Sequence, residues 1–162
     1  MKCIELSGKK GAGMFVLLDD EDYKKLSQWK WQLSNRGYAS RPQWLVPRKL
    51  NKQTTVYMHR MIMNFPISGV DHINMNKLDN RKGNLRLATS YQSSLNRGKH
   101  KDNSSGFKGV SWGKRDKKWK AQITADGKYK WLGQYESKEE AAKVYNKAAK
   151  KYFGEFAYLN QL

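Results

Sequence analysis

The residues best suited to chemistry lie in one stretch, Val70–Arg97, which reads VDHINMNKLDNRKGNLRLATSYQSSLNR. It opens with an aspartate directly before a histidine, Asp71 and His72, and ends in a segment rich in amides and hydroxyls. A carboxylate supplies the oxygen ligand that Mg²⁺ prefers, and a histidine is suited to deprotonating a water molecule. The pair therefore predicts a metal-dependent phosphodiesterase site. The alternative is that Asp71 and His72 merely form a turn in a loop.

The charge of the chain predicts the source of the phosphodiester. The sequence has 32 basic and 14 acidic residues and a formal net charge of +18. Residues 1–96 carry 16 basic and 7 acidic residues, and residues 97–162 carry the same numbers. An even excess favours contact along an extended nucleic acid, since phosphate neutralisation supplies most non-specific affinity. The alternatives are a soluble basic protein, such as a ribosome-associated one, and an RNA-binding accessory factor.

Composition excludes several other classes. Cys3 is the only cysteine, which excludes a disulfide framework and a cysteine zinc site, and 3 histidines are too few for a histidine-rich zinc cage. The N-terminal MKCIELSGKK lacks the apolar run of a signal peptide, and no later run has membrane-spanning length. An intracellular protein with no membrane partner is expected. The 6 Trp, 9 Tyr and 5 Phe argue against disorder.

Secondary-structure signals divide the chain into two parts. In the first part we expect a buried strand, a helix Glu21–Trp31 capped by Asp19 or Asp20, and two further strands that flank a polar connection at 41–53; the three strands are 13–18, 37–39 and 54–58. His59 is expected to be a satisfied structural histidine in an apolar strand. The polar segment 98–106, with a solvated His100, predicts a linker.

The second part has the pattern β-β-β-α. Strands are expected at 107–112, 119–124 and 129–135, and Asp126-Gly127 predicts a hairpin turn because both residues tolerate positive φ. Ser137 and Glu140 form a capping box for a helix with a face of small residues, which Gly154 ends.

Both parts resemble known families. Residues 13–97 resemble HNH endonucleases of the phage and intron-homing type, through FVLLDDEDY, GYASR, HRMIM, VDHINMNKLDNR and NLRLAT. Residues 103–160 resemble the APETALA-type (ethylene-response-factor) DNA-binding domain, through FKGVSW, WKAQI, WLGQY, EEAAKVYNKAA and FGEFAYLN. The resemblance implies an α+β chain: a ββα-metal nuclease domain at 1–97, a basic linker at 98–106, and at 107–162 a three-stranded antiparallel sheet packed on one helix.

The nuclease resemblance implies a role for four residues. Asp71 would bind Mg²⁺ (or Mn²⁺), His72 would be the general base, and Asn84 would orient the imidazole by hydrogen bonding. Ser93 occupies the position of the second metal ligand, which is normally His or Asn. A serine hydroxyl is a poorer ligand than an amide carbonyl, so either weakened metal binding or a nuclease fold that only binds DNA follows.

Two groups of residues are expected to contact double-stranded DNA. Beside the nuclease site, contacts to the DNA backbone are expected from Lys77, Arg81, Lys82 and Arg86, although these four residues also fit a solvent-exposed face of the protein. In the second part the resemblance implies base contacts from Lys108, Ser111, Gln122, Thr124 and Trp131, and phosphate contacts are expected from Lys114 and Arg115 in the first turn.

The sequence thus predicts a metal-dependent endonuclease of the homing type. It would nick or cleave double-stranded DNA at a preferred site, as a monomer, in the cytoplasm of a phage-infected or mobile-element-bearing bacterial host. The alternative is a catalytically weakened HNH-fold DNA-binding protein of a phage or mobile element.

Overall fold

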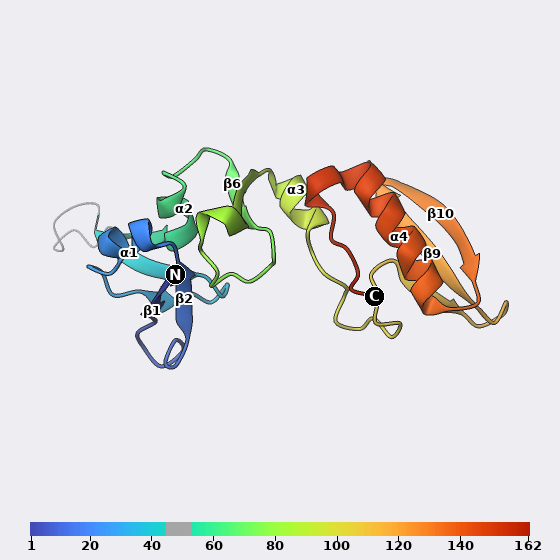
Figure 1. The fold of residues 1–162 in the computed structure, drawn as a ribbon, viewed down its shortest axis with the longest axis horizontal. Helices are drawn as coiled ribbons and strands as arrows, with labels where there is room; N and C mark the ends of the chain where they lie inside the picture. Colours follow the sequence, from blue (N-terminus) through green and yellow to red (C-terminus); the bar gives the residue numbers. More distant parts are fainter. Residues whose placement is uncertain (45–52) are drawn as a thin grey trace. The chain divides into compact units, whose positions relative to one another are not determined.

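The computed structural model describes residues 1–44 and 53–162, which form two compact units, Met1–Thr89 and Ser90–Leu162 (Figure 1). Each unit combines helices with small sheets, and the strand pairs of these described sheets are antiparallel. This arrangement is compatible with the expected α+β class. In the described part of the chain, no helix has the length and apolar character needed to cross a bilayer.

The first unit contains three small sheets. Its elements in chain order are β1 Lys2–Glu5, β2 Phe15–Leu18, α1 Asp20–Leu26, β3 Gln32–Leu33, β4 Ala39–Trp44, β5 Gln53–Tyr57, α2 Met58–Ile62, β6 Gly69–His72, the 3-10 turn η2 Lys82–Asn84 and β7 Leu85–Ala88. The sheets are β1-β2, β3-β4-β5 and β6-β7. Most of the connection expected at 41–53 lies outside the described residues.

The expected helix Glu21–Trp31 is too long, because α1 ends at Leu26. The indole Nε1 of Trp31 donates to the Leu26 carbonyl at 2.9 Å, so the chain turns back at this point and buries Trp31 completely. The side chain of Asp19 does not cap α1; it accepts from the backbone N–H of Lys82 at 2.7 Å. The sequence pattern did not predict the early helix end or the missing cap, because each depends on a contact with a residue outside the helix, Trp31 in one case and Lys82 in the other.

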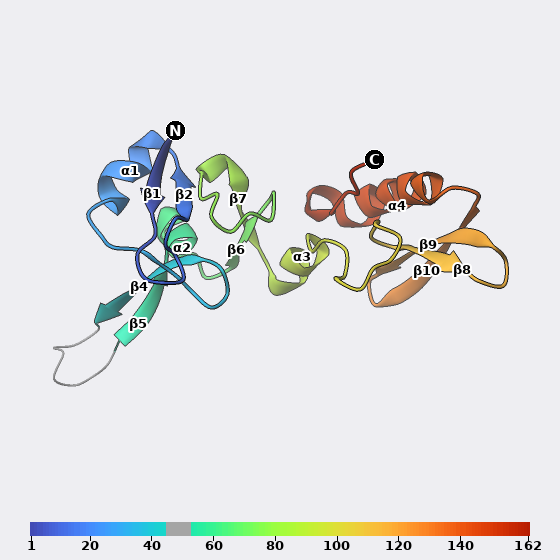
Figure 2. The same cartoon turned by 90° about the horizontal axis from the view of Figure 1, so that it is seen from below.

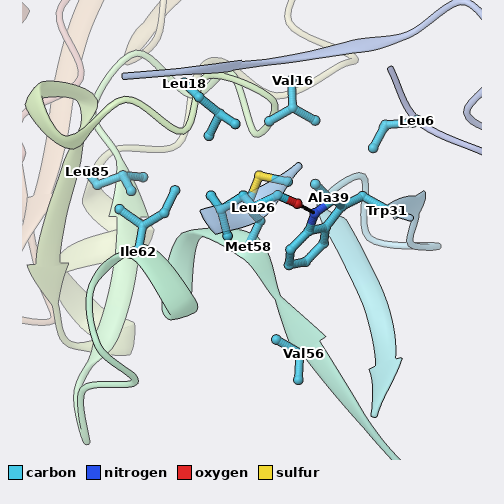
Figure 3. Packing of buried hydrophobic residues seen from close by; sticks show 10 residues of the cluster. All are labelled: Leu6, Val16, Leu18, Leu26, Trp31, Ala39, Val56, Met58, Ile62 and Leu85. Atoms are coloured by element: carbon cyan, nitrogen blue, oxygen red, sulfur yellow. Dashed lines mark hydrogen bonds between the residues drawn. The ribbon is translucent and has the colours of Figure 1, made fainter. Parts of the chain in front are cut away.

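An apolar cluster of described residues holds the first unit together. Leu26, Met58 and Trp31 lie at its centre in Figure 3, where the dashed line marks the Trp31 hydrogen bond. Met58 and Ile62 are one helical turn apart on α2 and both face this cluster. The stretch that begins at His59 was expected to be a strand and is a helix instead.

The hairpin β6-β7 carries the candidate chemistry. Asp71 and His72 lie at the end of β6, not in a loop, and they pair in register with Arg86 and Leu85 of β7. At the start of the hairpin a Cβ on Gly69 would lie 2.8 Å from the carbonyl oxygen of Ala88. The close approach of the two strands therefore requires glycine at this position.

The second unit is a three-stranded sheet with one long helix along it (Figures 1 and 2). Its elements are α3 Ser90–Leu95, β8 Val110–Gly113, β9 Lys118–Ala125, β10 Lys128–Tyr135, α4 Lys138–Phe153 and the 3-10 turn η3 Gly154–Phe156. The sheet order is β10-β9-β8. Ser137 accepts from the Glu140 N–H at 3.1 Å, and Gly154 ends α4 at φ +54°, as predicted.

Small residues let α4 lie close to the sheet. Ala141, Ala142 and Ala149 of α4 and Ala121 of β9 are fully buried. The closest approach is at Gly109, where φ is +75° and a Cβ would lie 2.1 Å from the Tyr145 ring. The last residues of the expected linker are part of this unit: Ser105 is buried and donates to the Val110 carbonyl at 2.8 Å.

Candidate active site and DNA-binding face

The β6-β7 register places Arg86 opposite Asp71. Both guanidinium contacts reach one carboxylate oxygen, Asp71 Oδ2, from Nε at 3.1 Å and from Nη2 at 2.9 Å. The two side chains are only 12% and 10% exposed, so Arg86 is not part of a solvated face. This ion pair fixes the position of the Asp71 carboxylate beside His72.

His72 is buried, with 4% of its surface exposed, and its Nε2 lies 3.2 Å from Oδ1 of Asn80. Burial lowers the pKa of His72, and the Asn80 hydrogen bond and the Asp71 charge oppose that shift in part. The neutral imidazole, which is the form able to accept a proton, is therefore favoured near neutral pH.

Asn84 organises the loop between the two strands. Its Nδ2 donates to the Asp79 carbonyl at 2.7 Å, and its Oδ1 accepts from the Asn74 N–H at 3.0 Å. The amide beside His72 is that of Asn80, a residue that the sequence analysis did not single out. Asn80 lies within VDHINMNKLDNR, but the spacing gives no reason to prefer it over the other amides of that segment.

The same loop also holds Arg81. Asp79 is almost fully buried, and Arg81 binds both of its carboxylate oxygens at 2.7 and 2.6 Å, while Asn74 Nδ2 donates to it at 2.8 Å. The Arg81 hydrogen bond, with help from Asn74, holds the pKa of Asp79 below its usual value even though burial opposes this. The loop is thus a closed polar network rather than a free turn.

The two lysines predicted to contact DNA beside this loop also have partners within the protein. Lys82 pairs with Glu21 and with Asp22, and Lys77 donates to the Arg36 carbonyl at 2.8 Å. The Lys82–Glu21 pair is exposed, and such pairs contribute little stability. A DNA phosphate can therefore replace Glu21 at small cost.

An aromatic cluster surrounds His72 on another side. His59 of α2 is 6% exposed, and its ring lies 5.2 Å from that of His72, with Tyr38 and Tyr57 packed against it. Its Nδ1 is buried and has no hydrogen-bond partner among the described residues, so His59 is not the satisfied histidine that the sequence predicted. Burial, with the nearby His72 and Arg60, lowers the pKa of His59 to about 3.

The donor set around Asp71 can be compared with what a divalent cation requires. The described residues contain no group of three or more His, Cys, Asp and Glu side chains suited to a metal. Ser93 lies in α3, which clusters with the second unit. Asp71 thus contributes one carboxylate, a donor set that fits Mg²⁺ because this ion often takes one or two carboxylates plus water and substrate phosphates.

One face of the second unit's sheet gathers most of the predicted base-contacting residues. Gln122 and Thr124 are two apart on β9, and the register places Trp131 opposite Gln122 and Ser111 opposite Lys120, which shares the same face. The other face of β9 carries the buried Ala121, Ile123 and Ala125. The exposed face also includes Tyr129, whose hydroxyl donates to Gln122 at 3.1 Å; neither Tyr129 nor Lys120 was predicted.

Lys108 does not join this face. Its ammonium donates to the carbonyls of Leu95 at 2.9 Å and Arg97 at 2.6 Å, and burial lowers its pKa to about 8. Lys114 is exposed, as expected for a phosphate contact, whereas the exposed Arg115 pairs with Asp116 at 3.2 Å. The sequence missed the role of Lys108 because its partners lie eleven to thirteen residues away.

Comparisons with known proteins also support a chain made of two different parts. Residues 105–155 match the AP2 domain family, which indicates DNA binding. The chain is 32% identical over 160 residues to an uncharacterized HNH endonuclease of Acanthamoeba polyphaga mimivirus, covering 94% of this chain and 78% of that protein. It is also 36% identical over 88 residues to Protein 3.8 of Escherichia phage T7, covering 54% of this chain and 72% of that protein. The chain therefore belongs to the family of nuclease-type proteins that join an HNH endonuclease region to an AP2 domain.

Proposed function

We propose that the protein is a metal-dependent endonuclease that nicks or cleaves double-stranded DNA, with His72 as the general base. One observation carries the proposal: a buried imidazole at the end of β6, next to the Asp71 carboxylate and held by the Asn80 amide. Burial favours the neutral ring, so the base is ready to take a proton at neutral pH.

The contact with Asn80 identifies the reacting nitrogen. Oδ1 is an amide oxygen and can only accept, so Nε2 of a neutral His72 carries the hydrogen and donates it. The lone pair is then on Nδ1, and this atom takes the proton from the attacking water. The water oxygen bonds to phosphorus as the bond to the 3′-oxygen breaks, and no covalent enzyme intermediate forms.

Asp71 is the residue that would hold Mg²⁺ or Mn²⁺ in this proposal; Ser93 occupies the second-ligand position of the sequence resemblance alone. When bound there, such an ion would supply positive charge that stabilises the developing charge on the phosphate and on the leaving oxygen. Arg86 keeps the Asp71 carboxylate in place through two contacts to Oδ2. The ββα-metal arrangement is supported by the hairpin β6-β7 followed in the chain by α3.

DNA recognition is shared by both units. The exposed sheet face of the second unit binds the duplex and supplies a preference for a site, while Lys77, Arg81 and Lys82 hold phosphates near the hairpin. The relatives in a phage and in a giant virus support a mobile-element or viral setting, in which a monomer acts on DNA inside the host cell.

Nicking of supercoiled plasmid tests the proposal directly. The native chain is assayed with Mg²⁺, Mn²⁺ or EDTA beside His72→Ala, with His100→Ala as the matched control because that histidine is exposed. We expect metal-dependent nicking that His72→Ala lowers by about 10³-fold and His100→Ala leaves unchanged. Metal-independent nicking, or equal activity of His72→Ala, contradicts the proposal.

The contact between Arg86 and Asp71 favours a second function, DNA binding without cleavage. The Arg86 guanidinium already neutralises Asp71, and Ser93 is a weak ligand, so a DNA-binding protein without cleavage is the rival. It predicts native DNA binding in a gel-shift assay with no nicking in either metal. Nicking that appears only in Ser93→Asn would then identify the hydroxyl as the cause.

A further inference from the structure

We propose that His59 is a positioning residue for the general base: its ring, presented by α2, is the wall that sets the orientation of the His72 imidazole. The inference rests on the proposed function, because it assigns His59 to the same reaction. It concerns a residue to which neither the sequence pattern nor the comparisons give a role.

The ring contacts define this wall. The centroids of His59 and His72 are 5.2 Å apart and the planes meet at 72°, an edge-to-face contact. Tyr38 touches both rings, at 4.7 Å from His59 and 5.8 Å from His72. Tyr57 stacks on His59 at 5.7 Å with an interplanar angle of 29°. Edge-to-face and offset contacts of this kind fix the relative orientation of rings.

The wall is rigid because α2 is anchored. Met58 directly precedes His59 and is fully buried in the core of the first unit, and Ile62, one turn later, is buried in the same cluster. Burial of these two residues holds the backbone of His59 in place, and the contacts with Tyr38, Tyr57 and His72 restrain its ring. Asn80 fixes the Nε2 end of His72 independently, so the imidazole has a polar contact at one end and an aromatic one at its flank.

In this inference the aromatic surface of the His59 ring orients His72, and hydrogen bonding by the His59 nitrogens plays no part. Nδ1 is buried without a hydrogen-bond partner among the described residues, so the ring contributes no hydrogen bond through this atom. The strongly lowered pKa means that the ring is neutral at assay pH. Phenylalanine at this position therefore removes no hydrogen bond of Nδ1 and no charge, while it keeps a flat aromatic surface.

Loss of the ring should impair orientation and leave substrate binding intact. Without the wall, the imidazole can turn away from the attacking water, and a displacement of about 1 Å costs on the order of 100-fold in rate. We expect His59→Ala to lower kcat by about 10- to 100-fold with KM changed by less than about twofold. We expect His59→Phe to keep kcat within about threefold of the native value.

Kinetics of plasmid nicking by the full chain provide the first test. A lower kcat for His59→Ala than for His59→Phe, with similar KM values, supports the inference that the His59 ring orients His72. An equal loss of kcat in both variants assigns the effect to the nitrogens and overturns the inference, as does full activity of His59→Ala. If His59→Ala does not fold, His59→Leu replaces it: a kcat well below that of His59→Phe supports an aromatic wall, and equal kcat overturns it.

A second readout does not depend on nuclease activity. The chain has three histidines, so ¹³C-labelled histidine gives spectra with few ring signals, and the His72 signals are assigned by their loss in His72→Ala. The ring contact predicts that these signals move in His59→Ala and stay near their native positions in His59→Phe, with exposed His100 as the unchanged reference. Unmoved His72 signals in His59→Ala overturn the inference. Absence of nicking by the native chain, with the shift present, counts against the proposed function alone.

Discussion

The two units carry the same excess of basic residues but arrange their polar side chains in opposite ways. In the first unit the groups around the hairpin turn toward one another, as in the pairs Asp71–Arg86 and Asp79–Arg81. In the second unit Gln122, Thr124 and Trp131 face outward from the sheet. Two units of equal net charge can therefore have different functions. A network of paired side chains suits chemistry at one bond, and an exposed polar face suits contact with a long polymer.

The hydrophobic cores of the two units also differ. The first unit packs large side chains such as Trp31, Leu26 and Met58 in one cluster, whereas the second packs α4 on its sheet through several alanines together with Tyr145 and Phe153. Large interlocking side chains resist the displacement of the elements that hold a reacting group. The alanines of α4 bring the helix close to the inner face of the sheet and leave the opposite face exposed.

The largest expected effect separates catalysis from binding. Asn80→Ala removes the acceptor at Nε2 of His72 and should lower kcat of nicking by about 100-fold, because the imidazole loses its polar anchor. DNA affinity measured by gel shift without metal should change by less than about twofold. A parallel loss of affinity would show that the hairpin network also serves binding.

The alanine packing of the second unit gives the next prediction. Ala142 is fully buried between α4 and the sheet, so Ala142→Leu should overpack this core and destabilise the unit by about 1–3 kcal/mol. Hydrogen exchange read by mass spectrometry should show faster exchange in β9 and α4. Unchanged protection of β2 and α2 is the control, and a loss of protection in both units would contradict separate cores.

The exposed face predicts a smaller change, in affinity. Trp131 is 49% exposed on the sheet face, and Trp131→Ala should weaken duplex binding by about tenfold, which is about 1.4 kcal/mol. Tyr152→Ala is a matched control because Tyr152 is 40% exposed on α4. Fluorescence anisotropy with labelled duplex measures both. An equal loss in the control variant would mean that the sheet face is not the binding surface.

The smallest expected effect concerns pH and the first unit. Burial lowers the pKa of His59 in the folded chain to about 3, below the usual histidine pKa of 6.5, so below pH 6.5 the unfolded chain takes up a proton that the folded chain does not. This term removes stability as pH falls from about 6.5 toward 3. Between pH 7.5 and 5.5, native protein should therefore lose about 1.4 kcal/mol more than His59→Phe.

Urea unfolding of the two proteins at both pH values measures that difference. The second unit contains one histidine, the exposed His100, so its own midpoint should show no comparable shift. Equal pH dependence of native protein and His59→Phe would show that His59 is protonated in the folded state.

Much of the second unit was predictable from local signals. The hairpin turn needs positive φ at Asp126 and Gly127 and has it, at 52° and 70°. Helix α4 begins after its Ser137 cap and ends at Gly154 as predicted, since caps act on neighbouring backbone groups. Gln122 and Thr124, which the resemblance singled out, lie on one face of β9 because side chains alternate along a strand.

The sequence by itself determined which residue types are available for chemistry and the boundaries that neighbouring residues set. Only the tertiary structure decided the environment of those residues: Asn80 and His59 beside His72, Arg86 on Asp71, and the diversion of Lys108 to two carbonyls. These partners are 8 to 15 residues apart in the chain. No local propensity specifies such contacts, because they form only when the burial of Trp31, Met58 and Leu95 brings distant segments together.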